Sequence, residues 1–269
     1  MTVGPEEFSR ERRTLIDQLI GMLLDLFGGL GSWRQEDIAE FQEQAIPAVQ
    51  ASQQTLAAMC ALYVASQASE QLGYEVAPPG IPDDAAVDLR EDVTPQEVYR
   101  RPFVTVYTYL SEGAPLDEAV EHGQNRLAEI VDADLQQTYA RAMQAAMEAV
   151  DVEPTERARF WRRTLVGETN CALCVIASTQ RYRVEDLNPI HPGCDCRVDP
   201  IFGEDPGQVI EPELLEQVHD AVEALTGESD RGGRATDYRQ LMVQMTPEHG
   251  ELGPMLVRPR DKFTSADDL

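Results

Sequence analysis

The feature that most restricts how this chain can fold is a cluster of metal-type ligands in one short segment. Four of the five cysteines lie within residues 171–196, together with one of the four histidines. They form the pattern Cys171-x2-Cys174, sixteen further residues, and then His191-x2-Cys194-x-Cys196. Disulfide-bonded secreted domains distribute their cysteines along the chain, whereas this clustering is typical of metal binding in a reducing compartment.

The spacing of the cluster predicts one zinc ion. Zinc takes four ligands in a tetrahedron, drawn from thiolate sulfur and imidazole nitrogen. Cys171 and Cys174 fit a tight turn that holds the metal between two thiolates, and Cys194 and Cys196 point to the same side of an extended chain. Five candidates compete for four positions, so two arrangements remain open. Either four thiolates bind with His191 outside, or three thiolates and His191 bind with Cys194 or Cys196 displaced.

Two disulfides, buried thiols without a metal, or a redox-active CxxC are the alternatives to a metal. Local disulfides would close very small strained rings, so cross-pairing is the more reasonable disulfide form. A redox-active CxxC usually lies at a helix start in a βαβ unit, and the sequence pattern shows no such unit. The motifs of zinc deaminases and zinc proteases are also missing, and four protein ligands leave no position for water. We therefore expect a structural zinc ion and a protein that is not an enzyme.

Long helices are expected ahead of the cysteine cluster. Apolar residues recur at helical spacing over residues 8–27, where three glycines end the pattern. The spacing of Ser32 and Gln35 predicts the N-terminal cap of a second helix, which extends to about Gln71 and stops at Gly73.

Two further helices follow a segment rich in proline and acidic residues. Thr94 and Pro95 form an N-cap and first-turn pair for a helix through Tyr109. Another helix is expected from residues 114–118 towards Val150, with seven apolar residues along one side: Leu127, Ile130, Val131, Leu135, Tyr139, Met143 and Met147.

The sequence thus predicts a mainly α protein with long helices, a small irregular Cys/His zinc-binding module and an extended C-terminal tail. Five segments make up the chain: a helical region at 1–74, a linker or an arm laid along a partner at 75–94, a helical region at 95–155, the zinc module at 156–202, and short helices with the tail at 203–269. The short helices are expected at 211–225 and 236–245.

The charge of the chain excludes several classes of function. There are 48 acidic and 22 basic residues, which gives a formal net charge of -26 at pH 7. This acidity disfavours extended binding to nucleic acid or to an anionic membrane, because both carry the same sign. Lys262 is the only lysine, so a phosphate-binding loop with a lysine and a Schiff-base lysine are excluded from the body of the protein.

No stretch of the sequence is apolar enough to span a bilayer. The best candidate, Leu15–Leu30, is interrupted by Asp17 and Asp25. Three arginines precede it, but the apolar run is too short for a signal peptide and lacks a cleavage site. We interpret it as an amphipathic helix of a protein made in the cytoplasm, with no membrane partner.

An arginine cluster just before the cysteines offers a second hypothesis for function. Four arginines surround two aromatic residues: Arg157, Arg159, Phe160, Trp161, Arg162 and Arg163. Such a patch is able to bind the backbone and bases of nucleic acid, which would make the chain a zinc-module nucleic-acid-binding protein. The alternative, which we favour, is a helix whose arginines pair with nearby acidic groups while the aromatic rings pack on the zinc module.

The cysteine segment also carries a resemblance to a known family. It reads Gly167-Glu168-Thr169-Asn170-Cys171-Ala172-Leu173-Cys174, then Ala177-Ser178-Thr179-Gln180-Arg181-Tyr182, then Pro189-Ile190-His191-Pro192-Gly193-Cys194-Asp195-Cys196. This pattern resembles MuF-like minor capsid proteins, the head-morphogenesis proteins of tailed phages, in the form found in phages of actinobacteria. Residues 103–107 through 134–136 and the tail at 248–256 are also similar to that group.

The resemblance implies a non-enzymatic component of the virion that is present in few copies. Proteins of this family associate with the portal protein at the capsid vertex, act in head assembly, and in some cases leave with the DNA. Further expected partners are the major capsid or scaffolding protein and other copies of the chain, while packaged DNA lies nearby without tight binding. Some relatives carry toxin or enzyme domains after this part, and no active site is recognisable in the residues that follow the cysteines here.

Overall fold

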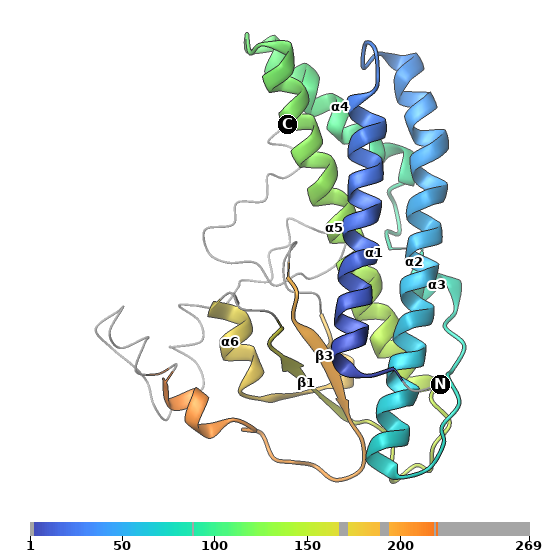
Figure 1. The fold of residues 1–269 in the computed structure, drawn as a ribbon, viewed down its shortest axis with the longest axis vertical. Helices are drawn as coiled ribbons and strands as arrows, with labels where there is room; N and C mark the ends of the chain where they lie inside the picture. Colours follow the sequence, from blue (N-terminus) through green and yellow to red (C-terminus); the bar gives the residue numbers. More distant parts are fainter. Residues whose placement is uncertain (1–2, 88, 167–171, 189–193, 218, 220–269) are drawn as a thin grey trace.

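Four long helices and a small sheet at one end of them make up the fold (Figure 1). The structure is a computed structural model that describes residues 3–87, 89–166, 172–188, 194–217 and 219. The long helices are α1 (Pro5–Gly28), α2 (Gln35–Leu72), α4 (Pro95–Ser111) and α5 (Leu116–Ala149). The described residues also include two short helices, α3 (Asp83–Ala86) and α6 (Ala172–Ser178), and a helical stretch at 212–217. The prediction of a mainly α protein is therefore confirmed.

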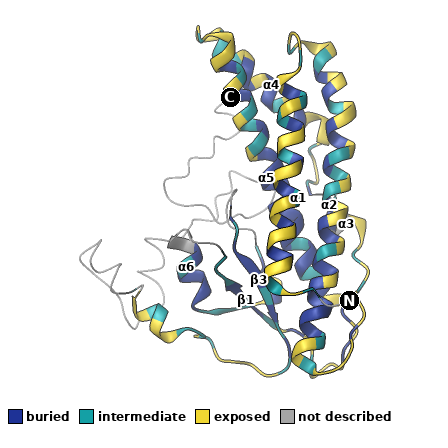
Figure 2. Cartoon of the chain, in the orientation of Figure 1, coloured by how far each residue is buried: buried dark blue, intermediate teal, exposed yellow. Residues whose placement is uncertain are grey.

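The apolar periodicity of the sequence defines the buried faces of the helices. All seven residues expected along one side of α5 are buried. Phe27 of α1, Phe41 of α2 and Phe103 of α4 meet edge to face, with ring centroids 4.9 to 5.7 Å apart. Such aromatic pairs add to the hydrophobic gain of burial, so this cluster joins three helices at one level of the bundle. Figure 2 shows that α1 and α2 keep an exposed face along their length.

The helix ends agree with the sequence at two positions and disagree at one. Thr94 accepts a hydrogen bond from the backbone N–H of Glu97, whose carboxylate accepts one from the backbone N–H of Thr94, so the predicted cap is present. Gly73 adopts φ 80° at the end of α2, a conformation that glycine takes without steric cost. The predicted cap at Ser32 is wrong, because Ser32 donates to the carboxylate of Asp37 and α2 starts only at Gln35.

The proline- and acid-rich segment at 75–94, which was expected as a linker or an arm, packs against its own chain. Val76, Ala86 and Leu89 are buried. The carbonyl of Ala86 accepts a hydrogen bond from the Thr138 hydroxyl, and the carbonyl of Leu89 accepts one from Arg141. The segment thus covers α5, with α3 inside it.

The residues after α5 form a sheet, which corrects the expectation of an irregular module. Strands β1 (Phe160–Thr164), β2 (Arg181–Arg183) and β3 (Arg197–Ile201) are antiparallel in the order β2-β1-β3. A single 3₁₀ turn, η1 (Val184–Asp186), follows β2. The arginine cluster is therefore not on a helix. The four cluster residues on β1, which are residues 160–163, alternate between half-buried and buried, as the period of two in a strand requires.

The C-terminal expectations lie mostly outside the described residues. Residues 212–217 are helical, in agreement with the start of the first predicted short helix. The remainder of that helix, the second short helix and the tail fall outside the described part. Among the helices that the structure describes, none has the length and apolar character needed to cross a membrane.

Candidate metal centre

Three of the predicted zinc ligands converge in the interior. Cys174 lies on α6, and Cys194 and Cys196 lie on the segment that leads into β3. Their sulfur atoms are all within 4.8 Å of one another, and those of Cys174 and Cys194 are 3.3 Å apart. Each residue is no more than 4% exposed. Helix α6 and the segment before β3, which are separated in the sequence, thus bring three thiols close together.

The other two candidates, Cys171 and His191, lie outside the described residues. The three described thiols nevertheless bear on the open choice of ligands. Cys194 and Cys196 both lie beside Cys174, so both sulfurs are close enough to Cys174 to share one ion with it.

The donor set fits a soft metal ion. Two sulfurs bound to one tetrahedral zinc at about 2.3 Å lie about 3.8 Å apart. This separation is about 0.5 Å more than the 3.3 Å between Cys174 and Cys194 and lies within the 4.8 Å that holds all three sulfurs. Thiolate sulfur favours zinc and other soft ions over magnesium or calcium. The three thiols can therefore take up positions around one ion with small movements of their side chains.

The electrostatics of the cluster favour one thiolate already without a metal. Hydrogen bonds with Cys174 and Cys196 lower the pKa of Cys194, and the Arg163 guanidinium adds to the effect. The pKa of Cys196 is raised, because the bond with Cys194, burial and the Cys194 charge outweigh the lowering effect of the bond with Cys174. A negative charge on one sulfur is what a dication requires at this position.

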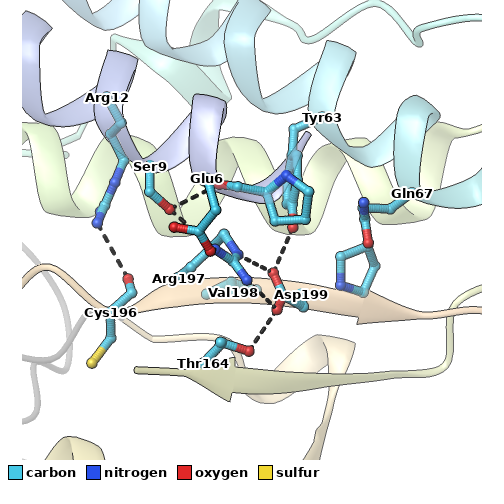
Figure 3. A network of polar contacts seen from close by, with 12 residues as sticks. Glu6, Ser9, Arg12, Tyr63, Gln67, Thr164, Cys196, Arg197, Val198 and Asp199 are labelled. Atoms are coloured by element: carbon cyan, nitrogen blue, oxygen red, sulfur yellow. Dashed lines mark hydrogen bonds and ion pairs between the residues drawn. The ribbon is translucent and has the colours of Figure 1, made fainter. Parts of the chain in front are cut away.

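Two side chains from distant helices hold the backbone of the cysteine segment. Arg12 of α1 donates to the carbonyl of Asp195 at 2.7 Å and to that of Cys196 at 3.3 Å, as Figure 3 shows for Cys196. Gln136 of α5 donates to the carbonyl of Cys194 at 2.8 Å. Because these carbonyls are bound from the helices, the positions of both cysteines are fixed relative to the bundle.

A buried polar network continues along β3 (Figure 3). The Asp199 carboxylate accepts hydrogen bonds from the hydroxyls of Tyr63 at 2.6 Å and Thr164 at 2.5 Å, and it pairs with Arg197 at 2.6 Å. Arg197 also reaches Ser9 and Glu6 of α1. A carboxylate withdrawn from most of its water, as that of Asp199 is at 17% exposure, needs such partners. Sequence reasoning missed this network, although Arg197 and Asp199 are two apart on a strand and so lie on the same face.

The structure divides the arginine cluster into two groups. Arg163 is 4% exposed and its guanidinium lies 5.2 Å from the centre of the Trp161 ring, while Arg162 pairs with Glu211 at 3.0 Å. Trp161 is buried and stacks on Tyr182. Arg157 and Arg159 are exposed. The expected pairing of arginine with an acidic group is thus present at Arg162, and the expected packing of an aromatic ring on the module is present at Trp161. Both residues lie on a strand, not on the expected helix.

The fifth cysteine is separate from the cluster. Cys60 is fully buried in α2, and burial raises the pKa of its thiol. A buried thiol of this kind behaves as a small apolar side chain. Cys60 therefore serves as an internal control for experiments on the cluster.

Comparison with known proteins identified no relative. A scan against models of protein families, a search of curated proteins and a search of solved structures each found no match for this chain.

Proposed function

We propose that the chain is a structural minor capsid protein of a tailed phage, associated with the portal vertex, in which the cysteine cluster holds one zinc ion. The observation that carries the zinc part is the convergence of Cys174, Cys194 and Cys196 in the interior. The fourth ligand is Cys171 or His191, since both are close in sequence to a converged cysteine.

The role of the zinc ion is structural in this proposal. The sheet consists of strands of three to five residues, which bury too little apolar surface to be stable alone. An ion bound to Cys174 and to the Cys194–Cys196 segment joins α6 to the start of β3. Metal binding of this kind contributes directly to the folding free energy. The zinc ion thus fixes the segment that Arg12 and Gln136 bind from the helices.

The capsid part of the proposal depends on the resemblance of the cysteine segment to MuF-like proteins. The long helices suit packing against a helical portal protein, and other copies of the chain or the major capsid or scaffolding protein are additional partners. A net charge of -26 would limit adhesion to the packaged DNA nearby. The expected location is the virion, after synthesis in the host cytoplasm.

The capsid proposal is tested by locating the chain in particles. We expect its peptides at low copy in purified mature virions or precursor heads, and we expect it to co-purify with the portal protein when both are expressed together. Absence from both kinds of particle would contradict the proposal. A C174S/C194S variant that remains in the host extract while C60S enters particles would link incorporation to the cysteine cluster.

The fourth ligand is tested by cobalt substitution. Cobalt in place of zinc gives absorption bands that report thiolate ligands and tetrahedral geometry. If Cys171 is the ligand, C171S changes the spectrum and H191N leaves it unchanged; the reverse pattern assigns His191. No change in either variant would contradict a site with four protein ligands from this set.

A further inference from the structure

A hollow of about 400 Å³ lies where the end of α5 meets the sheet. Three arginines line it: Arg157 and Arg159 before β1, and Arg183 on β2. Phe160 is half-buried and supplies accessible apolar surface to its wall, beneath which Met147 and Val184 are 1% and 5% exposed. The hollow therefore combines cationic groups with an apolar wall.

Two of the arginines have no direct partner. Arg157 and Arg159 are exposed, and within the described residues neither guanidinium makes a hydrogen bond or an ion pair. Arg159 acts only at longer range on Asp205, whose pKa is lowered chiefly by the backbone N–H of Gly207. Their charges are available to a ligand, in contrast to those of Arg162 and Arg163.

The acidic groups of the hollow do not pair with Arg157 or Arg159. Glu185 pairs with Arg183 at 3.2 Å, and Glu148 accepts a hydrogen bond from Gln144 at 2.9 Å. With three arginines and two carboxylates the hollow is positive by one charge. The chain around it is strongly acidic, since residues 1–155 contain 27 acidic and 9 basic residues. An isolated positive site of this kind suits a small anionic group better than a long polyanion.

We infer that this hollow binds one nucleotide unit, with Arg157 and Arg159 on its phosphate and the apolar wall against its base. Guanidinium groups bind phosphate oxygens through paired, charge-assisted hydrogen bonds. A volume near 400 Å³ is within the range of small-molecule sites, and a free phosphate ion would leave the half-buried Phe160 uncovered. The site is independent of the zinc and capsid proposals, and it uses different arginines from those that the strand buries.

A nucleotide unit can come from a free mononucleotide or from a single-stranded nucleic acid. We would titrate the full-length protein with a short fluorescein-labelled oligothymidylate, followed by anisotropy, and then add AMP as a competitor. The test variant is R157A/R159A. The matched control is R10A/R100A, which removes two exposed arginines on α1 and α4 and changes the net charge equally.

We expect R157A/R159A to bind the oligonucleotide about 10- to 100-fold more weakly, because two charge-assisted contacts are lost, and R10A/R100A to bind like the wild type. The slope of log affinity against log salt should fall from about -0.7, the value for one phosphate contact on a single strand, towards zero in R157A/R159A. Competition by AMP assigns the site to free nucleotides; arginine-dependent binding without competition assigns it to a strand.

Three results would overturn the inference: no binding of either probe by the wild type, equal affinity of the wild type and R157A/R159A, or an equal loss in R10A/R100A. R183Q gives a second test from the other side of the hollow, and a smaller loss is expected because Arg183 already pairs with Glu185. Thermal melts of each variant establish that the exposed substitutions leave the fold intact.

Discussion

The guanidinium of Arg12 lies 2.7 Å from the backbone carbonyl oxygen of Asp195, a contact between residues 183 positions apart in the sequence. It connects the first helix of the chain to the segment that carries two of the three converged thiols. The same guanidinium lies 4.4 Å from the centre of the Tyr139 ring of α5. Arg12 thus joins α1, α5 and the cysteine segment, and it is 3% exposed.

Substitution of Arg12 by alanine should therefore destabilise the fold. Loss of charge-assisted bonds to two carbonyls is expected to lower the free energy of unfolding by about 1.5 to 3 kcal/mol. R13A is the matched control, since the neighbouring Arg13 makes only exposed ion pairs with Asp17 and Asp195, worth below about 1 kcal/mol. Urea unfolding of both variants measures the difference. Equal stability of R12A and R13A would contradict the role of Arg12.

The Tyr63 hydroxyl should contribute more to stability than that of Tyr74. Both donate to a carboxylate at 2.6 Å, but Tyr63 is fully buried on Asp199, whereas Tyr74 is 43% exposed and bonds to Glu156. Y63F is expected to cost about 1.5 to 3 kcal/mol, because it removes a hydrogen bond to a charged group that is largely withdrawn from water. Y74F should change little, since water replaces its partner. Chemical denaturation of the two variants tests this, and an equal effect would argue against the network along β3.

A side chain at Gly123 should destabilise the protein, because α5 packs closely on α4 and α1 there. A Cβ added there would lie 2.6 Å from Cγ2 of Val106, 3.0 Å from the carbonyl oxygen of Pro102 and 3.1 Å from the ring of Phe27. G123A is expected to destabilise the protein by about 1 to 3 kcal/mol through overpacking. G21A on the exposed side of α1, where nothing lies within 4 Å, should instead stabilise it by about 0.5 to 1 kcal/mol. Thermal melts that show the same sign for both variants would contradict this packing.

The cap of α4 should make a pH-dependent contribution to stability. Hydrogen bonds from the backbone N–H and the hydroxyl of Thr94 lower the pKa of Glu97 below its ordinary value of 4.5. Because the pKa is lower in the folded state, the stabilisation by the charged Glu97 is fully present above pH 4.5. It is lost as the pH falls through the pKa of the folded protein. E97Q keeps a cap without titrating, so the difference in melting temperature between wild type and E97Q should change over this acidic range. E43Q, at an exposed carboxylate of α2, is the control. A constant difference across the range would contradict the prediction.

Periodicity and capping patterns predicted the parts of the fold that depend on neighbouring residues. The buried side of α5, the cap at Thr94 and the stop at Gly73 follow from local spacing, and the structure has all three. The strand at Trp161 was missed because its two aromatic residues and two arginines are adjacent pairs, so the sequence lacks the apolar–polar alternation of a strand. Only the burial along β1 alternates.

Local sequence patterns could not predict most contacts between segments that are far apart in the chain. Ligand spacing brought Cys174, Cys194 and Cys196 together correctly, since metal chemistry itself restricts the geometry. Nothing in the local sequence of Arg12 indicates a bond to Asp195, and the Tyr63–Asp199 contact spans 136 residues. Such contacts depend on how the helices pack around the sheet.

The metal content of the purified chain tests the central proposal most directly. Native mass spectra before and after a strong chelator, with thermal melts alongside, should be recorded for the wild type, C194S and C60S. We expect one zinc ion per chain in the wild type and in C60S, lost to the chelator together with a fall in melting temperature, and no zinc in C194S. A wild-type chain with no metal and a mass lower by four hydrogens would show two disulfides instead and would contradict the zinc site.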